Sequence, residues 1–462
     1  MNKPNLRKII SLLILSGTFF HAVVDPVVAG DQEFDSSVAA ILVKRCTECH
    51  NGFDLKGGLD LLSKTAVEKG GEIILVPNGS PFEAGKTDMR VHHAVARVVE
   101  SRRPLVYLNQ IGGQDELVFD GASFVMNADR TISWQLPAWQ EDLAITSWKR
   151  RGDGWICDQG NTCNIESGLE ATYQAMTLGL RDYVNKNGFP GVILGMSGGI
   201  DSAISAAVAV DALGPDRVHC VMMPSPYTSR ESLEDAASAA EMLGVKIDTV
   251  PIGPAMEAFE DMLSDHFEGS EAGIAEENIQ SRSRGLTLMA LSNKLGAMVL
   301  STGNKSEMSV GYATLYGDMC GGYSVLKDVY KMTVFELSRW RNKTKPNGAL
   351  GPAGTVMPER IISKPPSAEL KPDQKDADTL PPYDELDAIL HGLIEDEANV
   401  QDIASRGFDI EVVMKIWQML DRAEYKRRQA PPGVKIGHRA FGRDRRYPIT
   451  NSFKASYQLD NN

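Results

Sequence analysis

Eight consecutive residues have types and spacing suited to binding a phosphate chain: Gly195, Met196, Ser197, Gly198, Gly199, Ile200, Asp201 and Ser202. They follow the apolar run 192–194 and precede an alanine-rich stretch, which predicts a turn from a strand into a helix. Backbone N–H groups converge at a helix N-terminus, and the helix dipole favours an anion there. The adjacent glycines let a phosphate approach the backbone, and Asp201 adds a carboxylate that suits phosphate-bound Mg²⁺. An ordinary strand–helix turn is the alternative interpretation.

A second group of reactive residues lies near the N-terminus, where Cys46, Cys49 and His50 form the pattern C-x-x-C-H. Two thiols on one helical turn can add to the two vinyl groups of a haem, and the adjacent histidine can ligate its iron. The residues around this motif, over 31–71, resemble part of a small cytochrome c domain. One interpretation is therefore attached haem c, and the other is a C-x-x-C-H motif that carries no haem.

Residues 1–29 are typical of a secretory signal peptide. They begin with basic side chains, continue with an apolar run over 9–20 and end in Val27-Val28-Ala29, which suits a signal peptidase. An uncleaved membrane anchor is the alternative, and only in that case do we expect a membrane partner. Export agrees with the haem motif, because haem c is attached outside the cytoplasm.

The composition limits the classes of protein. The chain has 462 residues, enough for two or three domains, and its hydrophobic fraction of 42% allows a sizeable core. The formal net charge of −13 argues against a nucleic-acid-binding surface, so we expect no nucleic-acid partner. Six cysteines in this length do not make a disulfide framework.

The elements that position the phosphate turn follow a regular alternation after residue 166. Apolar runs separated by helical stretches predict a parallel sheet covered by helices on both faces, which is an α/β fold. Thr228 and Glu231 form a capping box that predicts a helix ending at Leu243. Ligands bind at the carboxyl ends of such strands, where the phosphate turn and Thr302 both lie. Strands are expected over 191–195, 218–222, 246–251 and 297–301, and helices over 169–185, 201–213 and 276–295.

Six further segments narrow the interpretation: residues 276–282, 301–307, 312–322, 363–370, 424–428 and 435–442. Together with the phosphate turn, and in this order, they resemble the synthetase domain of the NAD synthetase family over about residues 166–455. The resemblance implies a Rossmann-like sheet of the adenine nucleotide alpha hydrolase type. It also implies a homodimer that uses ATP and Mg²⁺ to amidate deamido-NAD through an adenylated intermediate, which is the last step of NAD biosynthesis.

The same resemblance assigns roles to individual residues. It implies that ATP contacts the phosphate turn, Thr302 and Lys327, and that Asp201 and Glu307 hold Mg²⁺. The expected catalytic set is Asp201, Glu307 and Asp318, and Asp318 would read the nicotinate end or guide ammonia. The loop around Lys364 and Ser367 resembles a mobile segment that closes over the site in this family. Surface charge, a helix start or a solvated helix face is the alternative for these residues. Deamido-NAD would contact Asn278, Arg282, Glu307, Lys426 and Lys435.

Residues 72–145 resemble the second half of a nitrilase-like carbon–nitrogen hydrolase, an α/β sandwich, and more narrowly the glutaminase domain of glutamine-dependent NAD synthetase. Strands over 73–76, 105–109 and 123–126 and a helix over 91–101 carry the resemblance. The family's glutaminase uses a Glu, a Lys and a nucleophilic Cys, all upstream of the strand that matches 73–76. In this chain the signal and the haem motif fill that stretch, so we expect no glutamine hydrolysis and the use of free ammonia.

The remaining segments are expected to connect or extend these parts. Residues 146–165 are predicted to be a connecting segment, and residues 348–382, which are rich in proline and glycine, a flexible linker. Helices are expected over 386–395 and 410–427.

Two other interpretations of the whole chain stay open. An exported c-type haem electron carrier with an inert synthetase-like passenger would explain the leader and the C-x-x-C-H motif. The abrupt change near Gly71 would also fit a reading frame that joins two unrelated genes. ATP and deamido-NAD are cytoplasmic, so we expect any ligase activity in the cytoplasm, whereas the leader predicts periplasmic export.

Overall fold

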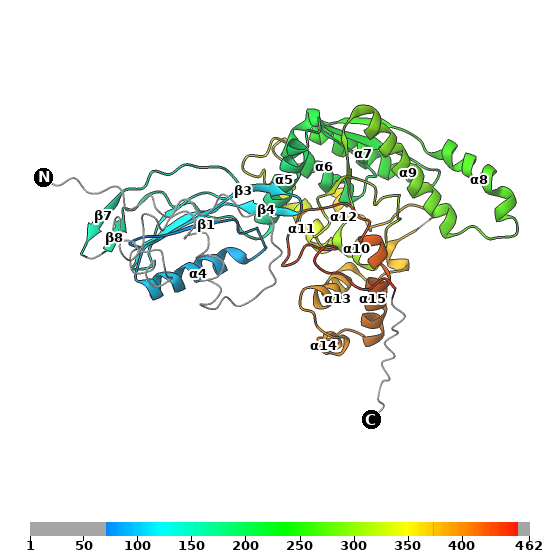
Figure 1. The fold of residues 1–462 in the computed structure, drawn as a ribbon. Coiled ribbons are helices and arrows are strands. Elements are labelled where there is room, and N and C mark those ends of the chain that lie inside the picture. Colours follow the sequence, from blue (N-terminus) through cyan, green and yellow to red (C-terminus); the bar gives the residue numbers. More distant parts are fainter. Residues whose placement is uncertain (1–70, 153, 373, 451–462) are drawn as a thin grey trace, which may run out of the picture. The chain divides into compact units, whose positions relative to one another are not determined.

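The structure is a computed structural model that describes residues 71–152, 154–372 and 374–450. The predicted signal peptide, the C-x-x-C-H motif and nearly all of the cytochrome c-like segment lie outside these residues. The chain divides into two compact units, whose elements are labelled in Figure 1. Of the described residues, the N-terminal unit comprises 71–80, 86–111 and 120–165 without 153, and the C-terminal unit comprises 81–85, 112–119 and 166–450 without 373.

The N-terminal unit contains a four-stranded sheet with the order β1 (Ile74–Asn78), β2 (Leu105–Asn109), β5 (Phe124–Met126) and β6 (Ile132–Gln135). β1 and β2 are parallel, and the other neighbouring strands are antiparallel. The helix α4 (Lys86–Ser101) packs on this sheet with its apolar face, because its buried residues lie one helical turn apart. The core of the unit is Ala94, Val98, Leu105, Tyr107, Phe124 and Met126.

A hairpin of β7 (Trp148–Arg151) and β8 (Gly154–Cys157) occupies the segment that we expected to be a connection. The buried Asn127 fixes this hairpin, because its side-chain amide donates to the Cys157 carbonyl at 3.1 Å and accepts the Cys157 N–H at 2.8 Å. The hairpin was not predictable from periodicity, because the side chains of β7 are mostly basic and show no apolar alternation.

A second hairpin, β3 (Ile111–Gln114) and β4 (Leu117–Asp120), lies where the chain passes into the C-terminal unit. Within that unit the Ala84 N–H donates to the Ile436 carbonyl at 3.0 Å, and the Lys435 N–H donates to the Glu116 carbonyl at 2.8 Å. Two short stretches that precede residue 166 are therefore built into the C-terminal unit by main-chain hydrogen bonds.

The C-terminal unit contains a five-stranded sheet with the order β11 (Lys246–Thr249), β10 (Val218–Met222), β9 (Val192–Gly195), β12 (Met298–Ser301) and β13 (Tyr323–Ser324). All neighbouring strands are parallel. Their side chains are mostly apolar and buried in the three central strands, as expected of strands covered on both faces. The predicted α/β fold with a parallel sheet is confirmed.

Helices cover both faces of this sheet (Figure 1). On one face lie α6 (Ile200–Leu213) and α7 (Arg230–Leu243), with α5 (Gly168–Lys186) beside α6. On the other face lies α9 (Ile274–Leu295), with α8 (Gly253–Phe267) along its side. The strand order reverses between β9 and β12, because the chain first builds β10 and β11 outward and then returns past β9. Ligands of open α/β sheets bind at such a reversal.

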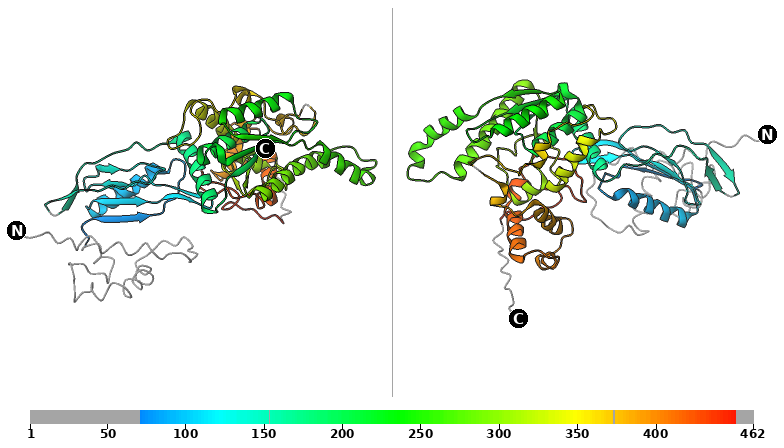
Figure 2. Two further views of the ribbon diagram at one scale, coloured as in Figure 1. Left: turned by 90° about the horizontal axis from the view of Figure 1, so that it is seen from above. Right: turned by 180° about the vertical axis from the view of Figure 1, so that it is seen from behind.

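The rest of the C-terminal unit is mainly helical, and the orange helices gather together in the right-hand view of Figure 2. The helices α10 (Lys305–Val310), α13 (Tyr383–Ile394), α14 (Val400–Ala404) and α15 (Ile410–Arg422) share one apolar core. The helix expected over 410–427 is interrupted at Ala423, which separates α15 from α16. No helix in the described part of the chain has the length and apolar character needed to cross a membrane. The elements are α10 (Lys305–Val310), α11 (Lys331–Lys343), α12 (Glu359–Ser363), α13 (Tyr383–Ile394), α14 (Val400–Ala404), α15 (Ile410–Arg422) and α16 (Glu424–Arg427).

The segment 348–382 is not the structureless linker that its composition predicts. It contains α12, and the side chains of Val356, Met357 and Ile361 are buried. Proline and glycine here shape an ordered surface loop rather than a free connection, because the apolar residues between them pack into the unit.

The start of α7 also differs from the prediction. The N-cap residue is Ser229, whose hydroxyl accepts the Ser232 N–H at 3.2 Å, and the predicted cap Thr228 accepts the Ser225 N–H at 3.0 Å. Threonine and serine are both good caps, so two adjacent candidates leave the helix start uncertain by one residue.

A fully buried ion pair joins α6 to α11. The guanidinium of Arg341 donates to both carboxylate oxygens of Asp211, at 2.6 and 2.9 Å, and the Tyr173 hydroxyl donates to the same carboxylate at 2.6 Å. Both charged side chains are 0% exposed. The pair therefore ties three helices together at a point that water does not reach.

Candidate functional site

A cavity of about 370 Å³ opens at the carboxyl ends of β9 and β12, where the strand order reverses. Its walls include the phosphate turn, the start of α7, Thr302 at the end of β12, Asp318 and the segment 364–370. This volume falls within the range of natural small-molecule sites. Within the phosphate turn, all residues except Gly198 line the cavity.

The geometry of the phosphate turn explains its glycines. Gly198 has a φ of +77°, and a Cβ there would lie 2.2 Å from the Ser232 carbonyl oxygen, so only glycine fits. The hydroxyls of Ser197 and Ser202 accept the N–H groups of Gly199 and Ser197, each at 3.2 Å. The turn is thus fixed by its own hydroxyls, and α6 begins within it at Ile200. The first N–H groups of a helix have no partner within the helix, so they can bind an anion.

A buried lysine joins the two carboxylates that we expected to hold Mg²⁺. The Lys331 ammonium donates to Asp201 at 2.5 Å and to Glu307 at 3.0 Å, and its side chain is 2% exposed. The Asn304 amide donates to the second oxygen of Asp201 at 2.8 Å, and Asn304 also caps α10, which carries Glu307. All of these groups except Asn304 line the cavity, so it presents two carboxylates and one ammonium beside the phosphate turn.

The position of Lys331 is fixed by the first turn of α11. The Lys331 N–H donates to the Ser306 hydroxyl at 2.9 Å, and the Met332 N–H donates to Asp387 at 2.8 Å. The Ser306 hydroxyl itself donates to Asp387 at 2.5 Å. A carboxylate that accepts helix N-terminal donors is electrostatically favourable, so Asp387 holds α11 where its first side chain reaches the cavity.

The charges of this cluster depend on one another. Burial raises the pKa of Glu307 to about 7, while the ammonium of Lys331 opposes that shift. Burial disfavours the ammonium of Lys331, but the carboxylates of Asp201 and Glu307 outweigh it and raise the Lys331 pKa above its ordinary value. Lys331 therefore stays positive at neutral pH and supplies a fixed charge in a site shielded from water.

The donor set fits a magnesium–nucleotide complex. Mg²⁺ is commonly held by one or two carboxylates together with substrate phosphates, and Asp201 and Glu307 supply two carboxylates next to the phosphate turn. In the described residues no three His, Cys, Asp or Glu side chains gather closely enough to hold a metal ion by themselves. A Mg²⁺ ion held by Asp201 and Glu307 would complete its coordination with phosphate oxygens and water.

Asp318 is a further carboxylate that lines the cavity. Asp318 accepts the Thr314 N–H at 2.7 Å, and its own N–H donates to the Ser281 hydroxyl at 3.1 Å. Burial raises the pKa of Asp318 to about 6, although the Thr314 N–H favours the charged form. A cavity carboxyl that titrates near neutral pH is suited to exchanging a proton with a bound amine.

Comparison with known proteins decides the family. The family model described as NAD synthase matches residues 172–430, which is more than half of the chain and includes the phosphate turn, Glu307, Lys331 and Asp318. The chain belongs to the NAD synthase family. The resemblance predicted from the sequence motifs is thereby confirmed at the level of the family.

Individual relatives of the NAD synthase family agree. The chain is 50% identical over 385 residues to a glutamine-dependent NAD(+) synthetase of Rhodobacter capsulatus, covering 83% of this chain and 70% of the relative. A solved glutamine-dependent NAD+ synthetase of Acinetobacter baumannii, in complex with ADP, is 46% identical, with a TM-score of 0.61, over 84% of this chain and 69% of that one. A Cytophaga hutchinsonii enzyme at 20% identity shares the fold, with a TM-score of 0.66 over 83% of this chain and 70% of that one.

Three residues predicted to contact the NAD synthase substrate support a loop instead of lining the cavity. The Asn278 carbonyl accepts the Thr314 hydroxyl at 2.9 Å, and Arg282 donates to the Leu315 carbonyl at 3.3 Å. The Lys426 ammonium donates to the Gly311 and Ala313 carbonyls, at 2.8 and 2.7 Å. They lie outside the described lining of the cavity. In this structure they fix the loop that leads to Asp318.

Two other predicted lysines make contacts with neighbouring residues of the C-terminal unit. The Lys327 ammonium donates to the Pro431 carbonyl at 2.6 Å, and Lys435 lies 3.6 Å from the carboxylate of Glu83. Both side chains are almost fully buried and neither lines the cavity. Lys331, four residues after Lys327 and at the start of α11, does line the cavity, and it contacts Asp201 of the phosphate turn.

Sequence reasoning assigned no role in the site to several charged residues that line the cavity, among them Lys331, Arg284 and Asp376. Lys331 had a detectable signal, because it opens a helix close to the predicted Lys327. Arg284 shares α9 with Arg282 but faces inward, where it donates to the Met223 carbonyl at 3.1 Å. Asp376 lies in the segment taken for a linker and accepts the Tyr383 hydroxyl at 2.8 Å. The segment around Lys364 and Ser367 does line the cavity.

Proposed function

We propose that the chain catalyses the ATP-dependent amidation of deamido-NAD to NAD. Membership of the NAD synthase family and the names of the relatives support this proposal. The observation that carries it is the group of Asp201, Glu307 and Lys331 beside the phosphate turn, at the reversal of the sheet. This arrangement suits a triphosphate with its Mg²⁺, and Asp318 lines the same cavity.

The chemistry needs activation of a carboxylate, because oxide is a poor leaving group. The nicotinate carboxylate of deamido-NAD attacks the α-phosphorus of ATP, which forms an acyl adenylate and releases pyrophosphate. Ammonia then attacks the acyl carbon, and AMP leaves. The protein's task is to hold two polyanions in line and to offset the charge that moves onto the leaving pyrophosphate.

Each part of the cavity has a role in that sequence. The N–H groups of the phosphate turn bind and orient the phosphates, and the Lys331 ammonium offsets negative charge on them. Asp201 and Glu307 would hold the Mg²⁺ that accompanies ATP, which when bound stabilises the departing pyrophosphate. Thr302 lies at the end of β12, where it can contact the nucleotide. Asp318 can accept a proton from ammonium and so deliver neutral ammonia.

The nitrogen source is proposed to be free ammonia. A glutaminase of the nitrilase type needs an activated thiolate, and of the cysteines described in the N-terminal unit Cys157 is buried, with a pKa that burial raises. Cys163 is the other, and it lies after the strands that resemble the glutaminase. A thiol with a raised pKa is a poor nucleophile at neutral pH.

The nitrogen source is tested with the purified full chain, ATP, Mg²⁺ and deamido-NAD. We expect NAD to form with ammonium and not with glutamine, measured by an NAD-specific dehydrogenase assay. Equal rates with the two nitrogen sources would contradict the proposed use of ammonia. No NAD with either source, from folded protein, would contradict the proposed reaction itself.

Asp318→Asn tests the proton-accepting role. Because the Asp318 carboxyl has a pKa of about 6, its charged form increases as the pH rises through 6, so wild-type activity should rise over the same interval. We expect the variant to lose roughly 10- to 100-fold in rate at pH 7.5 and to lose that rise. Rates are compared at constant free ammonia, because ammonium titration alone would otherwise impose a slope.

The matched control for this experiment is Asp216→Asn, which changes an exposed carboxylate away from the cavity. It should retain the wild-type rate and the wild-type pH profile. An Asp318→Asn protein that keeps the rise near pH 6 would show that another group is responsible.

A further inference from the structure

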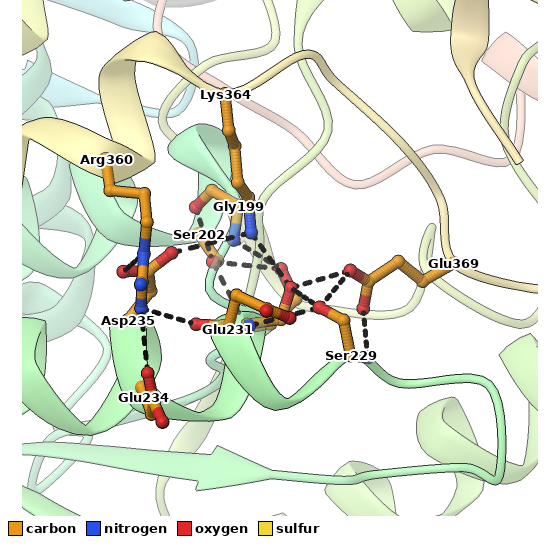
Figure 3. A network of polar contacts seen from close by, with 11 residues as sticks. Gly199, Ser202, Ser229, Glu231, Glu234, Asp235, Arg360, Lys364 and Glu369 are labelled. Atoms are coloured by element: carbon orange, nitrogen blue, oxygen red, sulfur yellow. Dashed lines mark hydrogen bonds and ion pairs between the residues drawn. The ribbon is translucent and has the colours of Figure 1, made fainter. Parts of the chain in front are cut away.

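The segment 360–370 covers one side of the cavity and is tied to α7 by charged side chains (Figure 3). Arg360 donates to Asp235 at 2.8 Å and lies 3.3 Å from Glu234. Lys364 donates to the Ser232 hydroxyl at 2.8 Å. These contacts fasten the beginning of the segment, before it passes over the cavity.

Glu369 fastens the far end of the segment to the first turn of α7. Its carboxylate accepts the Ser232 hydroxyl at 2.6 Å and the Ser229 hydroxyl at 2.9 Å, and it lies 3.4 Å from the Ser229 N–H (Figure 3). A carboxylate at a helix N-terminus is favoured by the helix dipole, and hydrogen bonds to a charged acceptor are stronger than neutral ones. Glu369 therefore makes the tightest contact between the end of the segment and α7.

The backbone of Glu369 shows that this contact is held against a conformational preference. Its φ is +49°, in the left-handed region that residues other than glycine rarely adopt. Such a conformation persists only where surrounding interactions compensate it. The compensating interactions include the carboxylate contacts with Ser229 and Ser232 and the Gln280 amide, which donates to the Leu370 carbonyl at 2.7 Å.

The same turn of α7 also packs against the phosphate turn. Gly198 approaches Ser232 so closely that a Cβ at residue 198 would lie 2.2 Å from the Ser232 carbonyl oxygen. Ser232 thus lies between the phosphate turn on one side and the side chains of Lys364 and Glu369 on the other. The first turn of α7 therefore contacts both the phosphate turn and the segment 360–370.

We propose that Glu369 is a positioning residue that latches the segment 360–370 over the cavity and so excludes water during the reaction. This role rests on the proposed function, because an acyl adenylate is the species that water would destroy. With the segment open, water attacks the acyl carbon, the acyl–oxygen bond breaks, and AMP and deamido-NAD are released. ATP is then consumed without forming an amide, whereas a latched segment leaves ammonia as the nucleophile.

The first test measures the latch without any substrate. Hydrogen exchange of the backbone amides of residues 367–371 is compared in the full-length wild type, Glu369→Ala and Glu369→Gln. We expect exchange to be about tenfold faster in Glu369→Ala, with a smaller increase in Glu369→Gln, which keeps an acceptor oxygen but loses the charge. Glu359→Ala, in the exposed start of α12, is the control and should exchange like the wild type.

The second test measures what the latch protects, as the ratio of AMP released to NAD formed with saturating ammonium. The wild type and Glu359→Ala should give a ratio near one, and Glu369→Ala a ratio raised by up to about tenfold. A purely structural role would lower both products together and leave the ratio unchanged.

Unchanged exchange in Glu369→Ala would overturn the latch. Faster exchange with an unchanged AMP-to-NAD ratio would overturn the protective role. A wild-type chain that formed no NAD would refute the proposed function instead, and the substrate-free exchange measurement would still decide the latch.

Discussion

Lys331→Met should reduce NAD formation by about 10²- to 10³-fold, because it removes the fixed positive charge beside the phosphate turn. The methionine side chain has nearly the length of the lysine stem, so packing at this 2% exposed position is kept. The carboxylates of Asp201 and Glu307 would lose their shared partner and repel each other. The measurement is the initial rate with saturating ATP, Mg²⁺, deamido-NAD and ammonium.

Lys327→Met is the matched control for this variant. It removes a lysine of equal size four residues earlier in the chain, whose ammonium donates to the Pro431 carbonyl. We expect a loss of less than about tenfold, which is the scale of one hydrogen bond. If Lys327→Met were the more damaging variant, the assignment of the phosphate-site lysine to Lys331 would be wrong.

Asp211→Ala should lower the free energy of unfolding by about 3–5 kcal/mol, because it leaves the guanidinium of Arg341 buried without its anion. Both side chains are 0% exposed, so water cannot replace the lost carboxylate. The measurement is the midpoint of urea unfolding. Trp340 is a local reporter, since its ring lies 5.3 Å from the ring of Tyr173, which donates to Asp211.

Arg230→Ala gives the contrast for this stability experiment. Arg230 forms an ion pair with Glu234 at 2.9 Å, but its side chain is 89% exposed. Exposed pairs contribute about 0–1 kcal/mol, so the unfolding midpoint should barely move. Similar shifts for the two variants would show that burial does not set the strength of the Arg341–Asp211 pair.

The sequence was sufficient for the parallel sheet and for the location of the cavity. Apolar runs alternated with helical stretches, and a turn with two adjacent glycines marked the end of β9. These signals are local, because each depends on residues close together in the chain. The same alternation of apolar runs and helical stretches predicted the end of β12, directly before Thr302.

The charges inside the cavity were less accessible to sequence reasoning. Lys327 and Lys331 are four residues apart, and only the packing of α11 on Ser306 and Asp387 decides which ammonium reaches Asp201. Asp376 lies in a stretch whose prolines and glycines suggested a linker. Contacts between residues far apart in the chain decide such positions, and no local periodicity encodes them.

The main-chain hydrogen bonds that join Ala84 to Ile436 and Lys435 to Glu116 bear on how such a protein could change through evolution. A gene deletion that removed everything before residue 166 would also remove the partners of Ile436 and Lys435. The C-terminal unit therefore cannot be separated from the rest of the chain at residue 166 without losing main-chain hydrogen bonds. A descendant that lost the upstream half would have to keep these two main-chain hydrogen bonds or replace them with contacts from other side chains.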